Sequence, residues 1–154
     1  MCGGATVFNV LEQFGTKPTD RVGVIGINGL GYLAIQFASK MGCDAVVFSQ
    51  TKSRKAKAMK LSANEYFATK ASKKLKIGAG IDHLLVCTSQ QPDWKLFLPI
   101  MAPNETIYPP TVSEEKFKMP YGPINAVKLP SVGEPCGAEV GASGDVRVCC
   151  EAWD

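Results

Sequence analysis

The sequence has no run of apolar residues that approaches the eighteen or so needed to span a membrane, so we expect no membrane partner. Its six cysteines form no C-x-x-C pair, which excludes a zinc ribbon and a thioredoxin-type redox motif. The segment Met1–Thr6 carries no basic group, so we expect no secretory signal and a cytoplasmic location. With 45% apolar and 20% charged residues, the 154-residue chain has the composition of a folded globular protein.

Acidic residues are scarce in one stretch of the chain. From Lys52 to Lys76 the only acid is Glu65, although this stretch holds nine of the 17 lysines and arginines. Two solvated helix faces explain this charge most simply. A nucleic-acid-binding surface is the alternative, but Tyr66 and Phe67 are its only aromatic residues, so we do not expect a nucleic-acid partner. The nine cations are Lys52, Arg54, Lys55, Lys57, Lys60, Lys70, Lys73, Lys74 and Lys76.

Short runs of β-branched residues alternate with segments of helical periodicity. The connections are too long for hairpins, so the pattern predicts a parallel sheet with right-handed crossovers, the doubly wound α/β class. We expect helices over residues 5–14, 30–41, 54–61 and 93–101, and strands over 22–27, 45–48, 65–68, 81–87 and 106–108.

Proline and glycine become frequent after Pro109. A sixth strand is expected over residues 127–132, and Pro130 within it would confine this strand to the edge of the sheet. We expect this Pro/Gly-rich C-terminal segment to be irregular, with residues 136–154 forming an irregular tail.

A glycine-rich turn joins the first predicted strand to the helix that follows it. Gly26 and Gly31 occupy the first and third positions of the pattern G-x-G-x-x-G, and Asn28 occupies the second. In a dinucleotide site these glycines permit the tight turn, the approach of the pyrophosphate and the packing of helix on strand. The phosphates bind free N–H groups at the helix start, here those of Gly29 and Leu30. A hairpin turn at Asn28-Gly29 is the alternative, but the helical periodicity that follows favours the dinucleotide site.

The second predicted strand ends where the adenosine ribose of a dinucleotide would lie. An NAD site has Asp or Glu there to accept the ribose hydroxyls, and this sequence has neither. Hydroxyl groups and cations would instead bind a 2′-phosphate, which a carboxylate would repel. The segment therefore predicts NADP(H) as the cofactor, against the alternative of a solvated basic helix start. The residues concerned are Ser49, Thr51, Lys52, Ser53 and Arg54.

The sequence resembles the cofactor domain of zinc-type medium-chain alcohol dehydrogenases in three segments: Met-Cys-Gly-Gly-Ala-Thr-Val-Phe, Lys-Pro-x-Asp-Arg-Val and Gly-Ile-Asn-Gly-Leu-Gly-Tyr-Leu-Ala-Ile-Gln-Phe-Ala. The hydroxyl and cation cluster resembles the NADP-dependent, cinnamyl-alcohol-dehydrogenase-like branch. The resemblance extends from Met1 to about Met101. It implies a Rossmann-like dinucleotide-binding domain over residues 1–135, and hydride transfer between an alcohol or aldehyde and NADP(H).

The resemblance also implies roles for residues outside the glycine turn. Cys2 matches the third protein ligand of the family's catalytic zinc, and Thr6 matches a residue beside the nicotinamide ring. Thr88 and Ser89 lie where the end of the fourth strand lines the cofactor cleft. The other zinc ligands belong to a catalytic domain that should precede this chain and is absent from it, so zinc is doubtful here. His83, the only histidine, is expected to be structural, and no catalytic residue is assigned.

The sequence departs from the family pattern at several positions. Asn28 places a side chain where the pyrophosphate would approach, so we expect poor cofactor affinity. Ser62 and Asn64 replace the Gly and Asp of a Leu-Gly-Ala-Asp turn. Pro130 and Pro135 fall in the segment through which such dehydrogenases pair their sheets, so a homodimer is doubtful.

Two functions remain open from the sequence. The leading one is the NADP(H)-binding domain of a zinc-type alcohol dehydrogenase, truncated and inactive alone. The alternative is a free-standing NADP(H)-binding module without catalysis.

Overall fold

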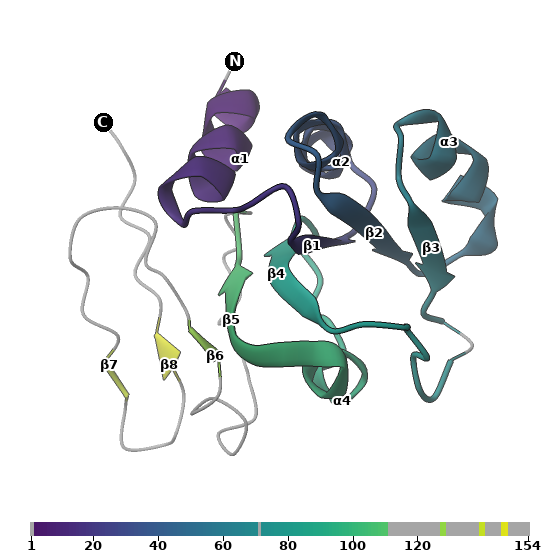
Figure 1. The fold of residues 1–154 in the computed structure, drawn as a ribbon. Helices are drawn as coiled ribbons and strands as arrows, with labels where there is room; N and C mark the ends of the chain where they lie inside the picture. Colours follow the sequence, from purple (N-terminus) through teal and green to yellow (C-terminus); the bar gives the residue numbers. More distant parts are fainter. Residues whose placement is uncertain (1, 71, 111–126, 129–138, 141–145, 148–154) are drawn as a thin grey trace.

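A computed structural model describes residues 2–70, 72–110, 127–128, 139–140 and 146–147. Its main sheet has six strands in the order β3-β2-β1-β4-β5-β6 (Figure 1), and every neighbouring pair is parallel. This topology confirms the predicted doubly wound, Rossmann-like class. The strands are β1 Arg21–Ile25, β2 Asp44–Ser49, β3 Glu65–Ala68, β4 Ile81–Val86, β5 Met101–Tyr108 and β6 Val127–Lys128.

Helices cover both faces of the sheet, and each face has its own apolar cluster. Side chains of α1, α2 and α3 pack with one set of strand residues, whereas Trp94 and Phe97 of α4 pack with the other set. Two faces are thus buried, which explains why the strands are continuous apolar runs and do not alternate with polar residues. The helices are α1 Cys2–Gln13, α2 Gly29–Lys40, α3 Lys55–Lys60 and α4 Trp94–Phe97, with 3₁₀ turns at Lys52–Arg54 and Leu98–Ile100.

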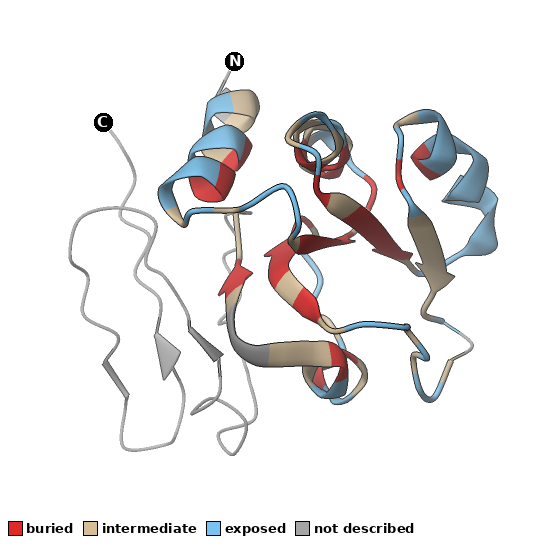
Figure 2. Cartoon of the chain, in the orientation of Figure 1, coloured by how far each residue is buried: buried red, intermediate tan, exposed pale blue. Residues whose placement is uncertain are grey.

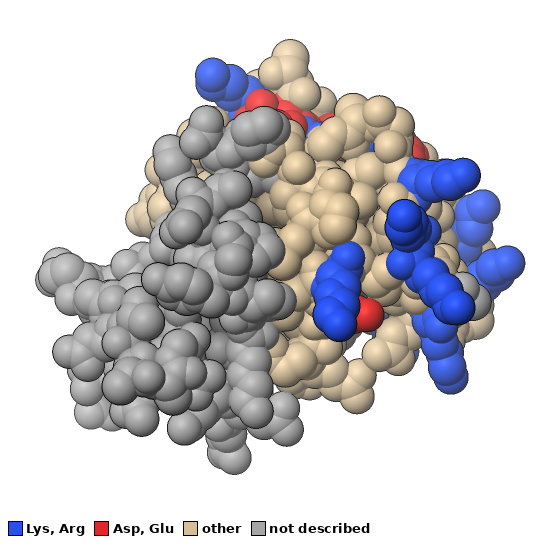
Figure 3. Space-filling model, turned by 90° about the horizontal axis from the view of Figure 1, so that it is seen from below, with Lys and Arg blue, Asp and Glu red and all other residues tan. Residues whose placement is uncertain are grey.

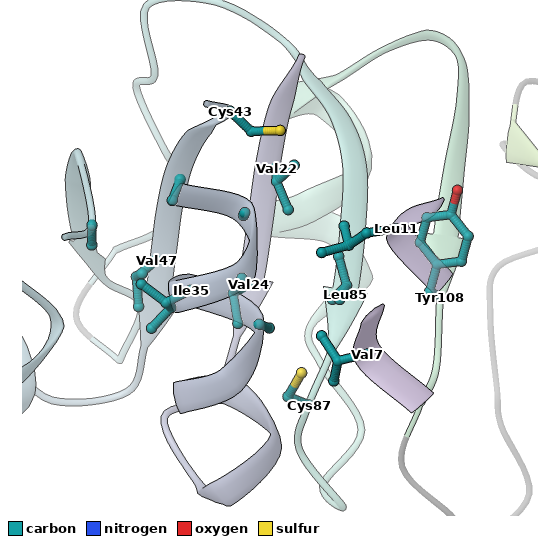
Figure 4. Close-up of a cluster of buried hydrophobic side chains, with 14 of the residues drawn as sticks. Val7, Leu11, Val22, Val24, Ile35, Cys43, Val47, Leu85, Cys87 and Tyr108 are labelled. Atoms are coloured by element: carbon teal, nitrogen blue, oxygen red, sulfur yellow. The ribbon is translucent and has the colours of Figure 1, made fainter. Parts of the chain in front are cut away.

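The core is densest around the central strands. Buried residues concentrate on β1, β2 and β4, whereas most of α3 is exposed (Figure 2). In Figure 4, Val7 and Leu11 of α1 and Ile35 of α2 point toward Val24 and Leu85 in the sheet. Each such side chain, when fully buried, stabilises the fold by about 1.5–3 kcal/mol. These contacts hold α2 against β1, and so fix the turn between them.

Two elements differ from the sequence expectations, one through a bulge in strand pairing and one through a proline. β5 begins at Met101 and not at residue 106, because its pairing with β4 contains a bulge: Ile81 pairs with Met101 but His83 with Thr106. The helix expected over 93–101 ends at Phe97, and a 3₁₀ turn that contains Pro99 follows. Proline lacks the N–H that a longer helix would need.

An ion network ties the amino ends of the strands together. The Arg21 guanidinium is buried, and it bonds Asp44 at 2.6 Å, the Glu65 carboxylate and the carbonyl of Ala79. Burial alone lowers the pKa of Arg21, but the two carboxylates outweigh it and raise the pKa above its usual value. Arg21 is thus a permanent cation that links β1, β2 and β3 at the edge opposite the glycine turn.

Within the tail expected to be irregular, β7 Glu139–Val140 and β8 Val146–Arg147 pair antiparallel. The rest of residues 136–154 lies outside the described residues, as do Pro130 and Pro135, so the domain limit at residue 135 and the doubtful homodimer stay predictions. No helix among the described residues is long and apolar enough to cross a membrane.

Candidate functional site

The carboxyl ends of β1, β2 and β4 form one edge of the sheet. The chain runs outward from β1 to β2 and β3, and then returns to the other side of β1 with β4. The strand order therefore reverses between β1 and β4, and ligands of doubly wound folds bind at such a switch point. The ladder continues past the strands there, since Gly26 N–H donates to Phe48 O and Cys87 N–H to Ile25 O, both at 2.9 Å.

The turn after β1 requires glycine at two positions. Gly26 has φ +93°, a conformation that residues with a Cβ rarely adopt, and a Cβ there would lie 3.2 Å from Thr88 Cβ. A Cβ on Gly31 would lie only 2.1 Å from Gly26 O. The tight turn and the close packing of helix on strand are as the pattern predicts, and the contact with pyrophosphate stays a prediction.

Asn28 is the N-cap of α2. Its backbone is extended, at φ −122° and ψ −167°, and its Oδ1 accepts from Gly31 N–H at 3.1 Å. Its Nδ2 donates to the carbonyl of Cys87, just past β4. The hairpin alternative at Asn28-Gly29 is therefore wrong, because Gly29 begins a helix. Through its bond to the Cys87 carbonyl, the Asn28 side chain connects the glycine turn to the end of β4. That Asn28 crowds a pyrophosphate stays a prediction.

The residues predicted to bind a 2′-phosphate gather beside the glycine turn. Ser49 ends β2, and the hydroxyls of Thr51 and Ser53 lie 2.9 Å apart. The Arg54 guanidinium donates through Nη1 to the carbonyl of Ile27, inside the turn. A long cation from the 3₁₀ turn is thus placed next to the start of α2, where anions are favoured.

The predicted nicotinamide-side residues lie on two elements. Thr88 and Ser89 follow β4, and Thr88 Oγ1 accepts from Gln90 N–H at 3.2 Å. Thr6 is on α1, whose start packs close to α2, since a Cβ on Gly3 would lie 2.9 Å from Leu30 Cδ2.

Sequence reasoning missed three polar residues at this edge. The Tyr66 hydroxyl of β3 donates to the carbonyl of Thr51 and so supports the predicted phosphate segment. Gln50, one residue past β2, donates through Nε2 to Oε1 of Gln90 at 3.0 Å. Exposed glutamines belong to no motif, so the sequence carries no signal for this contact.

The charge of the described surface is uneven. In Figure 3 the lysines and arginines gather toward the side on which α3 and β3 lie, with few acids among them. Lys52 and Arg54 belong to this basic stretch and are exposed. The absence of a nucleic-acid partner therefore stays a prediction.

The described residues do not fit a catalytic zinc site. No group of three His, Cys, Asp or Glu that could hold a metal occurs among them. His83 lies nearer the opposite edge, where Nδ1 is 3.1 Å from the Tyr108 hydroxyl and Nε2 is 3.2 Å from Asp20 Oδ2. Both ring nitrogens thus have partners within the fold, which agrees with the structural role expected of His83, and that role stays a prediction. Cys2 begins α1, and its side chain is outside the described part of the structure.

Burial also makes the inner thiols poor ligands. It raises the pKa of Cys87 to about 12, so this thiol is neutral at ordinary pH. Burial likewise raises the pKa of Cys43, with help from the charge of Asp20. Metals bind the thiolate, not the thiol, so neither residue substitutes for the ligands that the resemblance implies.

Comparison with known proteins finds curated relatives of similar sequence. An aldehyde reductase from Synechocystis sp. is 32% identical over 104 residues, which cover 67% of this chain and 31% of the relative. An NADP-dependent alcohol dehydrogenase from Mycolicibacterium smegmatis is 27% identical over 138 residues, 89% of this chain and 40% of the relative. The chain thus spans less than half the length of these curated relatives.

Solved structures share the fold. A cinnamyl alcohol dehydrogenase from Sorghum bicolor superposes with a TM-score of 0.69 at 23% identity, over 82% of this chain and 37% of the other. A CAD from Helicobacter pylori, solved with NADP(H), gives 0.60 at 24% identity over 70% of this chain and 31% of the other. The family model described as "Zinc-binding dehydrogenase" matches residues 29–129, from the start of α2 onward. This chain belongs to the zinc-binding dehydrogenase family.

Proposed function

We propose that this chain is the NADP(H)-binding domain of a zinc-type alcohol dehydrogenase and has no dehydrogenase activity alone. The observation that carries the proposal is the glycine turn at the switch point, with Arg54 bonded to its Ile27 carbonyl. The relatives support it, because two of them are named for alcohol or aldehyde chemistry and one for NADP.

The residues of this chain would bind and orient the cofactor, which when bound supplies a nicotinamide that accepts or donates hydride. The cradle fits, since Gly26 and Gly31 leave no room for a Cβ and free N–H groups of Gly29 and Leu30 begin α2. The 2′-phosphate would meet the hydroxyls of Thr51 and Ser53 and the cations Lys52 and Arg54, with Ser49 at the strand end. Thr6, Thr88 and Ser89 would line the nicotinamide side.

No zinc-dependent step can be assigned to the described residues. They offer no group of three ligands, and the His83 imidazole is bonded to Asp20 and Tyr108. An alcohol or aldehyde substrate would therefore depend on a separate catalytic domain for its metal and for most of its pocket. Without that domain the chain would act as a dinucleotide-binding module, which is the second candidate function.

The proposal predicts tighter binding of NADPH than of NADH. From Ser49, the last residue of β2, to Arg54 the chain presents three hydroxyls and two cations and no carboxylate that would repel a 2′-phosphate. Titration calorimetry with both cofactors measures the preference. Replacement Arg54→Ala is expected to weaken NADPH by about 1–3 kcal/mol, the scale of a charged hydrogen bond, and to leave NADH nearly unchanged.

Lys40→Ala serves as the control, because Lys40 is an exposed cation in the last turn of α2, away from the glycine turn. It removes the same charge and should change neither affinity. Equal affinities for the two cofactors, or tighter NADH, would contradict the proposal.

A further inference from the structure

A hydrogen bond between two exposed glutamines crosses the switch point. Gln50 directly follows β2, and Gln90 lies in the segment that follows β4. β1 lies between these two strands in the sheet, so the 3.0 Å bond from Gln50 Nε2 to Gln90 Oε1 passes over the end of β1. The two residues are 40 positions apart in the sequence.

Both glutamines are held at their backbones. The Gln50 carbonyl accepts from Lys70 N–H at 3.3 Å, and Gln90 N–H donates to Thr88 Oγ1 at 3.2 Å. The side chains, by contrast, are exposed, and their amides bond each other. Fixed backbones that carry exposed amides present donors and acceptors at a defined place on this edge.

The adenosine half of a dinucleotide would lie at this place. Its ribose belongs at the end of β2 and its phosphates at the start of α2, so the base extends over the same edge. Adenine carries its N6 amino donor beside ring-nitrogen acceptors, and a glutamine amide matches this pattern with paired hydrogen bonds. An exposed amide–amide bond has a small net free energy, so an equivalent bond to a base can replace it.

We propose that Gln50 and Gln90 are the adenine-recognition residues of this domain. On binding, their amides separate from each other and pair with the amino-bearing edge of the base. The inference rests on the proposed function, and it adds the base to a site that the glycine turn and Arg54 assign only to phosphates.

The test compares NADP⁺ with 1,N6-etheno-NADP⁺, in which a fused ring removes the N6 donor and blocks N1 while the phosphates stay the same. We expect the 154-residue chain to bind NADP⁺ about five- to tenfold more tightly than the etheno analogue, the scale of one or two neutral hydrogen bonds. Gln50→Leu and Gln90→Leu are each expected to weaken NADP⁺ about fivefold, with little change for the analogue.

Two control variants separate this effect from others. Gln36→Leu removes an exposed glutamine of α2 whose Nε2 bonds Tyr32 O, and should change neither affinity. Arg54→Ala should weaken both dinucleotides by the same factor, because both carry the 2′-phosphate.

The outcomes are distinguishable. A ratio of affinities that is the same in the wild type and in both glutamine variants overturns the adenine proposal and leaves the proposed function intact. Failure of the wild type to bind either dinucleotide overturns the proposed function, and the adenine proposal with it. The ratio of the NADP⁺ and etheno-NADP⁺ affinities can be measured on the wild type alone. The proposal can therefore be tested even if the glutamine variants do not fold, because a wild-type ratio near one contradicts it.

Discussion

Both ends of the Asn28 amide are bonded within the protein. The Oδ1 atom caps α2 by accepting from Gly31 N–H, and Nδ2 reaches the carbonyl of Cys87. The cap therefore occupies an N–H at the helix terminus, where N–H groups are otherwise open to an anion. A single side chain thus stabilises the turn and uses one of the donors that a phosphate could bind.

The replacement Asn28→Gly is expected to tighten cofactor binding and to lower stability. It removes the side chain from the predicted path of the pyrophosphate and frees Gly31 N–H, so NADPH and NADH should gain equally. Loss of the two hydrogen bonds should lower the free energy of unfolding by about 1 kcal/mol. Calorimetry with both cofactors and urea denaturation measure the two effects. Unchanged or weaker binding in the variant would refute the steric argument.

The sequence predicts some residues of the site better than others, for a physical reason. Gly26 and Gly31 are recognisable because their constraints are local: a positive φ at Gly26, and the first turn of a helix that begins three residues later, at Gly29. The bond between Gln50 and Gln90 depends on β2 and β4 flanking β1, which only the folded sheet establishes. The second contact of Asn28, with Cys87, is hidden from the sequence for the same reason.

At the scale of elements, the end of α3 carries backbone strain. Ser62 has φ +67°, a left-handed conformation, and it stands where the family pattern has glycine. The next residues return the chain to β3, since Ala63 N–H bonds Ala58 O at 3.2 Å and Asn64 N–H bonds Ala45 O at 2.8 Å. Ser62 cannot relax without disturbing this return.

The replacement Ser62→Gly is expected to raise the free energy of unfolding by about 0.5–1 kcal/mol. Glycine adopts the left-handed region without a Cβ penalty, and this gain exceeds its greater freedom in the unfolded chain. Ser62→Ala keeps the Cβ and is the matched control, which should not stabilise. Urea denaturation of the three proteins measures the difference, and a lower midpoint for Ser62→Gly than for the wild type would contradict it.

The sequence predicts β1 to β4 and α2 to within two residues, because long apolar or periodic runs determine them. It fails at β5, whose first residues contain Pro103 and a bulge against β4, and at the helix that Pro99 cuts short. In both places the structure depends on how a proline is accommodated by strand pairing or by packing with residues distant in the sequence, and the local sequence pattern does not show this.

For the whole molecule, buried ionisable groups make stability depend on alkaline pH. The pKa of Cys87 rises from an ordinary value of 9.0 to about 12 through burial. The folded state therefore favours the neutral thiol, and this contribution is complete below about pH 9 and is lost as pH rises toward 12. The pKa of Tyr108 is also raised to about 12 by burial, and adds to the loss above its ordinary value of 10.0.

The replacement Cys87→Val is expected to flatten this pH dependence. Between pH 9 and 10 the wild type should lose up to about 1.4 kcal/mol more than the variant, the free energy of one proton over one pH unit. Urea denaturation in reducing buffer at pH 8, 9 and 10 measures the slope of both proteins. Tyr108 and the other groups titrate in both, so they cancel in the difference. Parallel slopes would show that Cys87 is not held neutral by the fold.

The last prediction concerns catalysis by the 154-residue chain. We expect the purified protein neither to oxidise primary alcohols nor to reduce aldehydes, even with zinc added. Catalytic zinc needs three protein ligands and an open position. The described residues offer no such group, His83 is bonded on both nitrogens and Cys87 is a neutral thiol.

One thiolate from Cys2 could not hold the metal in a defined geometry. The absorbance of NADPH follows turnover in either direction, and calorimetry on the same sample shows whether the cofactor is bound. Bound cofactor without turnover is the expected result, since binding and hydride transfer then depend on different parts of the enzyme. Zinc-dependent oxidation of a primary alcohol by this chain would show that it carries a complete metal site, and would refute the assignment of catalysis to a separate domain.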